Sequence, residues 1–69
     1  MEFKENLRSI RLERGMTQKN VSDLLGVSLN GYASWEQGRT QPDIESIKKL
    51  CKIFKVSAND LLGIEIQNN

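Results

Sequence analysis

The chain is 69 residues long, contains one cysteine and no histidine, and has a formal net charge of +1. This length provides one domain with one small core, and the lone Cys51 and the missing histidines exclude an internal disulfide and an ordinary zinc site. Stability must then come from tightly packed helices or from self-association. No apolar run resembles a signal peptide or a transmembrane segment, so we expect a folded cytoplasmic domain with no cofactor, no metal and no membrane contact.

Charge is unevenly distributed along the chain. All ten Lys and Arg residues lie in residues 1–56 against seven Asp and Glu, which leaves +3, whereas the remaining segment carries Asp60 and Glu65 and no base, which leaves −2. The basic excess before residue 57 permits nucleic-acid binding but is too small to demand it.

The first predicted helix is amphipathic. Phe3, Leu7 and Ile10 are separated by four and three residues, which places them on one helical face. Good helix formers fill the positions between them, and Gly15 ends the helix just after Arg14.

Two further helices follow, separated by a very short connection. Thr17 and Ser28 are natural N-caps, and Gly26 closes the helix between them. The apolar positions of that helix, at helical spacing, are Val21, Leu24 and Leu25. Because only Val27 separates the glycine from the next N-cap, the two helices must cross steeply, which is a helix-turn-helix arrangement.

The segment after Ser28 is predicted to be a helix that Gly38 ends, with Tyr32 and Trp35 facing inward. Asn30-Gly31 is also a strong hairpin signal. We reject a hairpin because the flanking residues lack the alternating pattern of strands. Gly31 inside a helix costs up to about 1 kcal/mol relative to Ala, and a close approach of the helix to another surface would explain its presence.

The last two predicted helices complete the fold. Pro42 and Asp43 suit a helix start. The apolar stripe that follows comprises Ile44, Ile47, Leu50, Cys51 and Phe54. A short helix carrying Leu61 and Leu62 runs from the N-cap Ser57 to Gly63. The fold class is therefore all-α, a compact domain of five helices.

Several segments at helix ends resemble the Cro/C1-type helix-turn-helix regulators of the Xre family. The segments are Leu7-Arg8-Ser9-Ile10-Arg11, Arg14-Gly15-Met16-Thr17-Gln18, Leu25-Gly26-Val27-Ser28, Trp35-Glu36-Gln37-Gly38 and Phe54-Lys55-Val56-Ser57. The resemblance covers about residues 7–62, with the helix-turn-helix motif at about 18–37. It implies a lambda-repressor-like domain that binds a palindromic operator in double-stranded DNA as a homodimer, as a bacterial or phage transcription regulator. The recognition helix, about residues 28–37, would enter the major groove.

The outer face of this recognition helix should contact base edges. The predicted base contacts are Ser28, Leu29, Asn30, Ala33 and Ser34. Asn30 can pair with adenine through two hydrogen bonds, Leu29 can touch a thymine methyl group, and Ser34 can donate or accept. Gly31 would let the helix lie close to the DNA.

Other residues should contact the DNA backbone. In the family, a glutamine at the start of the second helix contacts DNA, and this implies a phosphate contact for Gln18. The helix N-terminus there favours an anion. Lys19 and the loop residues Arg39, Thr40 and Gln41 are further phosphate candidates. In relatives, the positions of Arg11 and Glu36 form a largely buried ion pair that is structural.

Two competing functions and several local alternatives remain at this stage. The same fold could serve as a protein-interaction module, with Leu29 and the Ile64-Glu65-Ile66 segment as the contact surface, and salt-dependent DNA binding would discriminate the two. An enzyme is disfavoured because no nucleophile–base pair or metal cluster is evident.

Residues 63–69 form a short tail that is a dimer strand, a disordered end or the lead into a further domain. Cys51 suits a structural thiol better than a redox sensor, and the lysines from Lys48 to Lys55 suit a solvated face better than a DNA-binding stripe.

Overall fold

The computed structural model describes residues 2–64, and within this range the chain folds into five α-helices. They are α1 (Phe3–Glu13), α2 (Gln18–Leu25), α3 (Leu29–Gln37), α4 (Ile44–Phe54) and α5 (Ala58–Leu62). The prediction of an all-α, five-helix domain is confirmed. No helix in the described part of the chain is long and apolar enough to span a membrane.

Side-chain caps fix where the helices begin. In four helices an N-cap oxygen accepts the backbone N–H three residues later, and these residues are Thr17, Ser28, Asp43 and Ser57. Left-handed glycines, which have no Cβ to strain, close three helices, and these are Gly26, Gly38 and Gly63. At the end of α4, Lys55 takes the left-handed conformation instead. There the Nε of Arg14 donates to the Phe54 carbonyl at 2.8 Å and satisfies an otherwise orphaned acceptor.

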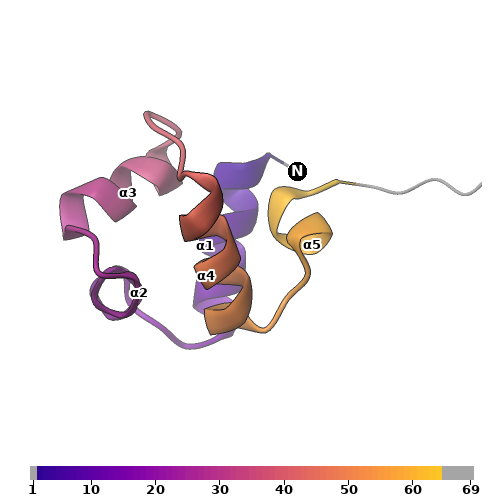
Figure 1. The fold of residues 1–69 in the computed structure, drawn as a ribbon, viewed down its shortest axis with the longest axis horizontal. Helices are drawn as coiled ribbons and strands as arrows, with labels where there is room; N and C mark the ends of the chain where they lie inside the picture. Colours follow the sequence, from indigo (N-terminus) through magenta and orange to yellow (C-terminus); the bar gives the residue numbers. More distant parts are fainter. Residues whose placement is uncertain (1, 65–69) are drawn as a thin grey trace, which may run out of the picture.

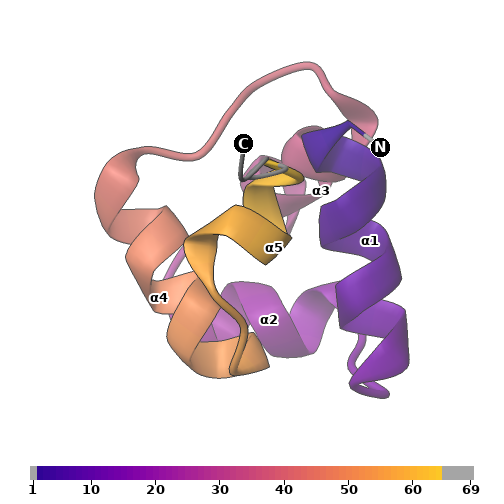
Figure 2. The same cartoon turned by 90° about the vertical axis from the view of Figure 1, so that its right-hand side faces the viewer.

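The five helices pack directly against one another. α1 contacts α3 and α5, α2 contacts α3 and α4, and α4 contacts α5. Figure 1 shows α2 and α3 at one end of the molecule and α5 at the other. In Figure 2, α5 lies between α4 and α1. The helix-turn-helix pair therefore occupies one end, away from the last helix.

Every helix contributes to one apolar core. The buried apolar residues are Leu7, Val21, Leu25, Tyr32, Trp35, Leu50, Phe54 and Leu61. Val27 and Cys51 are half-buried and pack against this cluster. Two polar residues, Arg11 and Ser22, are also buried. The hydroxyl of Ser22 donates to the Lys19 carbonyl at 3.0 Å, which satisfies it within its own helix.

Two residues expected in apolar stripes are instead exposed. Leu24 is 61% exposed and Ile44 is 73% exposed. The buried face of α2 is centred between Val21, Ser22 and Leu25, and at 100° per residue Leu24 points roughly 110° away from that centre. Ile44 is the first residue of α4, where the helix starts beyond the core.

The segment after α5 is described only as far as Ile64. Its N–H donates to the Asn59 carbonyl at 2.9 Å and closes α5, while the residue is 53% exposed. The predicted tail of residues 63–69 therefore lies mostly outside the described residues, including Glu65 and Ile66.

Candidate nucleic-acid interface

The inner face of α3 is locked into the core by two aromatic rings. Tyr32 is fully buried and Trp35 is 9% exposed, and their ring centroids lie 5.6 Å apart in an edge-to-face arrangement. The half-buried Val27 packs against the same core. These contacts determine which side of α3 faces away from the protein, as the sequence analysis expected.

The start of α3 presents exposed side chains. Ser28, Leu29 and Asn30 are all exposed, and Leu29 keeps 44% of its surface accessible. Within residues 2–64, the side-chain amide of Asn30 makes no hydrogen bond, whereas the hydroxyls of Ser28 and Ser34 do. The Asn30 amide is therefore free to pair with an external donor and acceptor.

Ser28 holds the start of α3. Its hydroxyl oxygen accepts the N–H of Gly31 at 3.0 Å, which is the N-cap bond. A Cβ on Gly31 would lie 2.9 Å from that oxygen, so a larger residue would push against the cap. This close approach within the helix gives Gly31 a structural reason that sequence analysis did not supply. The hydroxyl proton of Ser28 stays available for a base or phosphate oxygen.

Ser34 connects α3 to the loop that follows it. Its hydroxyl donates to the Gly31 carbonyl at 2.7 Å and also contacts the hydroxyl of Thr40. Its carbonyl accepts the N–H of Arg39 at 3.0 Å. The start of the loop is thus bonded to the half-buried Ser34, which keeps the backbone of the exposed Arg39 close to α3.

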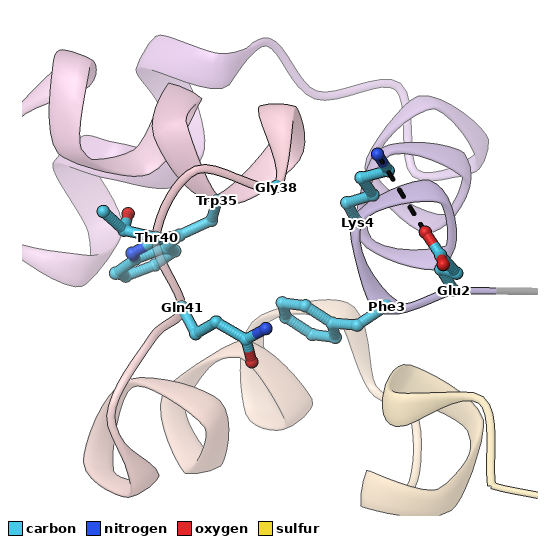
Figure 3. Close-up of a pocket in the computed structure, with 7 residues that line it drawn as sticks. All are labelled: Glu2, Phe3, Lys4, Trp35, Gly38, Thr40 and Gln41. Atoms are coloured by element: carbon cyan, nitrogen blue, oxygen red, sulfur yellow. Dashed lines mark ion pairs between the residues drawn. The ribbon is translucent and has the colours of Figure 1, made fainter.

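The far side of this loop faces α1 across a pocket of about 340 Å³. Figure 3 shows the Gln41 side chain beside the ring of Phe3, and Lys4 reaching toward Gly38. The Lys4 Cδ would lie 2.8 Å from a Cβ placed on Gly38, so the lysine stem covers the end of the recognition helix. Gln41 is predicted to contact DNA. The residue is exposed, but its side-chain amide lies next to Phe3 of α1.

A nearly buried ion pair lies behind α3. Arg11 and Glu36 bond through two contacts, Nε to Oε2 at 2.7 Å and Nη2 to Oε1 at 3.0 Å. Their side chains are 9% and 4% exposed. The remaining Nη1 of Arg11 donates to the Met16 carbonyl at 2.9 Å. This bidentate geometry fixes the end of α1 to α3 and also fixes the turn before α2.

The same carboxylate holds Gln18. The Nε2 of Gln18 donates to Glu36 Oε1 at 3.1 Å. One amide hydrogen is used in this bond, so the second remains for an acceptor outside the protein. The structure therefore joins the first residue of α2 to the last turn of α3, two positions that the sequence analysis assigned to different roles.

The network shifts the pKa values of its members. Burial by itself would raise the pKa of Glu36, but hydrogen bonds from Arg11 and Gln18 outweigh it, and the pKa lies below its ordinary value. The hydrogen bond from Glu36 likewise raises the pKa of Arg11. Burial, with the nearby carboxylate, raises the pKa of Tyr32. At neutral pH the pair is charged and the phenol is neutral.

The N-terminus of α2 has backbone donors to offer. Thr17 caps the N–H of Asn20, and Asn20 in turn accepts the N–H of Thr17 at 3.0 Å. This leaves the amides of Gln18 and Lys19 without an acceptor in residues 2–64. The Lys19 ammonium lies 3.3 Å from Asp23, an exposed pair. Free amides at a positive helix end suit a phosphate.

One residue of the outer face was missed. Gln37 is exposed and follows Asn30, Ala33 and Ser34 at helical spacing. The spacing of seven from Asn30 was available in the sequence, but the residue was interpreted only as part of the helix exit. No group of three or more Cys, Asp or Glu side chains gathers in the described region to hold a metal ion.

The chain is similar to bacterial and phage regulators over nearly its whole length. It is 37% identical over 65 residues to the HTH-type transcriptional activator BcrR of Enterococcus faecalis, covering 94% of this chain and 32% of that protein. It is 33% identical over 61 residues to the cryptic phage CTXphi repressor RstR of Vibrio cholerae, covering 88% and 55%. The chain thus spans about a third to just over half of these relatives.

Solved structures share the fold. A transcriptional regulator from Listeria innocua superposes with a TM-score of 0.85 at 33% identity, covering 99% of this chain and 65% of that one. The DNA-binding domain of the P22 c2 repressor superposes with a TM-score of 0.82 at 27% identity, covering 100% and 92%. A family model described as Helix-turn-helix matches residues 7–61. The chain therefore belongs to the helix-turn-helix family, in the Cro/C1 type that its sequence resembles.

Proposed function

We propose that this domain binds operator sequences in double-stranded DNA as a bacterial or phage transcription regulator, with α3 in the major groove. The observation that carries the proposal is the contrast across α3. Tyr32 and Trp35 fix the helix from inside, while Leu29 and Asn30 project from its first turn, and residues 2–64 offer the Asn30 amide no hydrogen-bond partner. A helix read from its N-terminal turn is the geometry by which helix-turn-helix proteins reach base edges.

The proposed base contacts are Ser28, Leu29, Asn30, Ala33 and Ser34. Asn30 is assigned the largest share, because its amide can pair bidentately with adenine, and such a pair discriminates against other bases by about 1–3 kcal/mol. Leu29 and the Ala33 methyl are assigned to thymine methyl groups. Ser28 and Ser34 contribute only the hydrogen-bonding capacity left over from their bonds to Gly31.

The proposed backbone contacts are Gln18, Lys19, Arg39, Thr40 and Gln41. Gln18 would donate its second amide hydrogen to a phosphate while the first holds Glu36. Arg39 would supply a charge-assisted contact from the loop held by Ser34. Each cation that meets a phosphate releases counterions, so affinity should fall as salt rises.

We further propose that the regulator acts as a homodimer on a palindromic operator in the bacterial cytoplasm. A single domain of this size buries about 600–1,000 Å² on DNA, less than most specific complexes. The similarity to repressor domains supports two copies on two half-sites, about 34–36 Å apart as in other dimeric helix-turn-helix proteins.

Selection from a pool of random duplexes tests the proposal. The full chain should enrich a palindrome, and its affinity should fall steeply between low and moderate salt. Asn30→Ala should lose preference at one base position per half-site. Asn59→Ala is the matched control, because Asn59 is an exposed asparagine on α5, and it should leave the selected sequence unchanged.

A second candidate function has one observation in its favour. Leu29 is 44% exposed at the tip of α3, which also suits contact with a protein. The same experiment separates the two functions. A failure to enrich any sequence, together with no salt-dependent retention on DNA, would favour a protein-interaction module and overturn operator binding.

A further inference from the structure

The pocket between α1 and the loop after α3 adjoins the proposed DNA surface (Figure 3). Its volume of about 340 Å³ lies within the range of protein binding pockets, roughly 300–1,000 Å³. Thr40 and Gln41, two of the proposed backbone contacts, form one part of its lining, and Phe3 and Lys4 of α1 form another. A group bound there would therefore touch both α1 and the loop that is proposed to follow the DNA backbone.

Lys4 places a positive charge at this pocket. Its Nζ would lie 3.4 Å from a Cβ placed on Gly38, so the ammonium lies over the residue that precedes Arg39. The lysine side chain remains 43% exposed. Among residues 2–64, its ion pair is with the Glu2 carboxylate at 3.9 Å, and that side chain is 75% exposed. Such an exposed pair is weak, which leaves the ammonium available to a stronger anion.

Trp35 adds a hydrogen-bond donor to the opposite wall. Figure 3 shows its indole ring next to Thr40, across the pocket from Lys4. The residue is only 9% exposed, yet its indole N–H makes no hydrogen bond within residues 2–64. The N–H of a buried tryptophan usually has a partner. An acceptor that enters the pocket from outside the chain would supply one.

We propose that a phosphate of the DNA backbone occupies this pocket, held by the Lys4 ammonium and the Trp35 indole N–H. A phosphate suits a pocket that combines one cation with N–H donors. DNA is favoured as its source because Thr40 and Gln41 of the same lining belong to the proposed backbone contacts. The inference rests on the proposed function and deepens it. Since Trp35 lies on α3 itself, a phosphate bound there would fix how the recognition helix is placed on the duplex.

Removal of the ammonium tests the charge. Lys4→Ala should weaken binding to the selected duplex and to a random duplex by the same factor, because a phosphate contact carries no sequence information. One lost contact lowers the logarithmic salt slope by about 0.9, so between about 50 and 200 mM salt the variant should lose roughly threefold less affinity than wild type. Lys52→Ala is the matched control, because it removes the same charge from α4 beside Ala58 of α5. It should leave the affinity and the slope unchanged.

A neutral methylphosphonate in place of one phosphate locates the anchor. When this replacement is scanned along the selected half-site, one position should cost wild type about threefold to tenfold in affinity and cost Lys4→Ala nothing. Trp35→Phe keeps a ring in the core but lacks the N–H. It should bind more weakly than wild type with an unchanged salt slope, because no charge is lost, and it should be less sensitive at the same position.

The sign of the ligand charge is tested at Glu2. Glu2→Gln should strengthen DNA binding at low salt by about twofold, because it removes an anion beside the proposed phosphate. Asp60→Asn is the matched control, since Asp60 is an exposed carboxylate on α5, and it should leave binding unchanged. Circular dichroism checks that each variant is folded at the temperature of the binding measurement.

Three results would overturn the inference. They are a wild-type salt slope in Lys4→Ala, a scan with no phosphate to which wild type alone is sensitive, and weaker DNA binding by Glu2→Gln, which would indicate a pocket for a cation. The first result would leave Lys4 only the role of a favourable charge at the C-terminal end of α3. Failure of the proposed function is a separate outcome, because the wild-type chain would then select no sequence and show no salt-dependent retention on DNA.

Discussion

The two sides of α3 differ in how their polar groups are used. Behind the helix, the Glu36 carboxylate bonds with both Arg11 and Gln18, and the side chains of Glu36 and Arg11 are nearly withdrawn from water. On the outer side, Leu29 and Asn30 are exposed, and their side chains make no hydrogen bond to any other part of the described chain. The residues expected to matter most for stability, Arg11 and Glu36, therefore differ from those expected to matter most for recognition, Leu29 and Asn30. Substitutions behind α3 should unfold the domain, and substitutions in front should change its ligand.

The largest expected effect is the loss of one partner of the buried ion pair. Arg11→Ala should lower the free energy of unfolding by about 3–5 kcal/mol, because it leaves the Glu36 carboxylate buried and unpaired. Urea unfolding followed by circular dichroism measures the change. Arg8→Ala is the matched control, since Arg8 is an exposed arginine on the same helix. A loss of less than about 1 kcal/mol for Arg11→Ala would contradict a structural role for the pair.

Stability should also depend on pH through Glu36. Its pKa is lower in the folded chain than in the unfolded chain, so its contribution is complete at pH values above the unfolded pKa and disappears as pH falls through the folded one. The free energy of unfolding should thus decrease from about pH 5 downward. Glu36→Gln should reduce the slope of that decrease.

The control for the pH series is Glu5→Gln, which removes an exposed carboxylate from α1. It should leave the slope unchanged. Some slope should persist in Glu36→Gln, because the hydrogen bond to Ser46 also lowers the pKa of the Asp43 cap. An acid profile identical in wild type and Glu36→Gln would show that the pair does not govern acid unfolding.

An intermediate effect is expected at the start of α3. Gly31→Ala gains up to about 1 kcal/mol of helix propensity but places a Cβ against the Ser28 oxygen and disturbs a cap worth about 1 kcal/mol. The single variant should be close to neutral. In a Ser28→Ala background, where no cap remains, the same change should stabilise by about 1 kcal/mol. Thermal unfolding of the four proteins closes this cycle, and equal effects in both backgrounds would argue against the clash.

The smallest effect on stability is expected at Lys19. Its pair with Asp23 is exposed on both sides, so Lys19→Ala should change the free energy of unfolding by less than about 0.5 kcal/mol. On DNA, however, the logarithmic salt dependence of binding should become shallower by about one unit if its ammonium meets a phosphate. An unchanged salt dependence would remove Lys19 from the interface.

The sequence predicted the fold well because local signals coincide with helix ends. Thr17, Ser28 and Ser57 cap helices where the pattern placed them, and the glycines that follow close them. The burial of Tyr32 and Trp35 also followed from spacing. Leu24 and Ile44 were misjudged because spacing identifies an apolar stripe but does not say how much of it the neighbouring helices cover.

The candidate site was less predictable, because hydrogen bonds between distant residues have no local signal. Nothing in the sequence indicates that Gln18 bonds to Glu36, or that Thr40 contacts Ser34. The hydroxyls of Ser28 and Ser34 look equally free in the sequence, yet both are engaged in the fold. Only the contacts reveal that, among residues 2–64, nothing takes up the hydrogen-bonding capacity of the Asn30 amide.

The central claim is that the outer side of α3 and the adjoining α2 end form the DNA surface, and amide chemical-shift mapping tests it most directly. The ¹⁵N-labelled full chain is titrated with its selected duplex. We expect the largest shifts at residues 18–19, 28–34 and 39–41, with the outward residues of α1 unaffected. Shifts confined to α4 and α5, with α3 unchanged, would contradict the account.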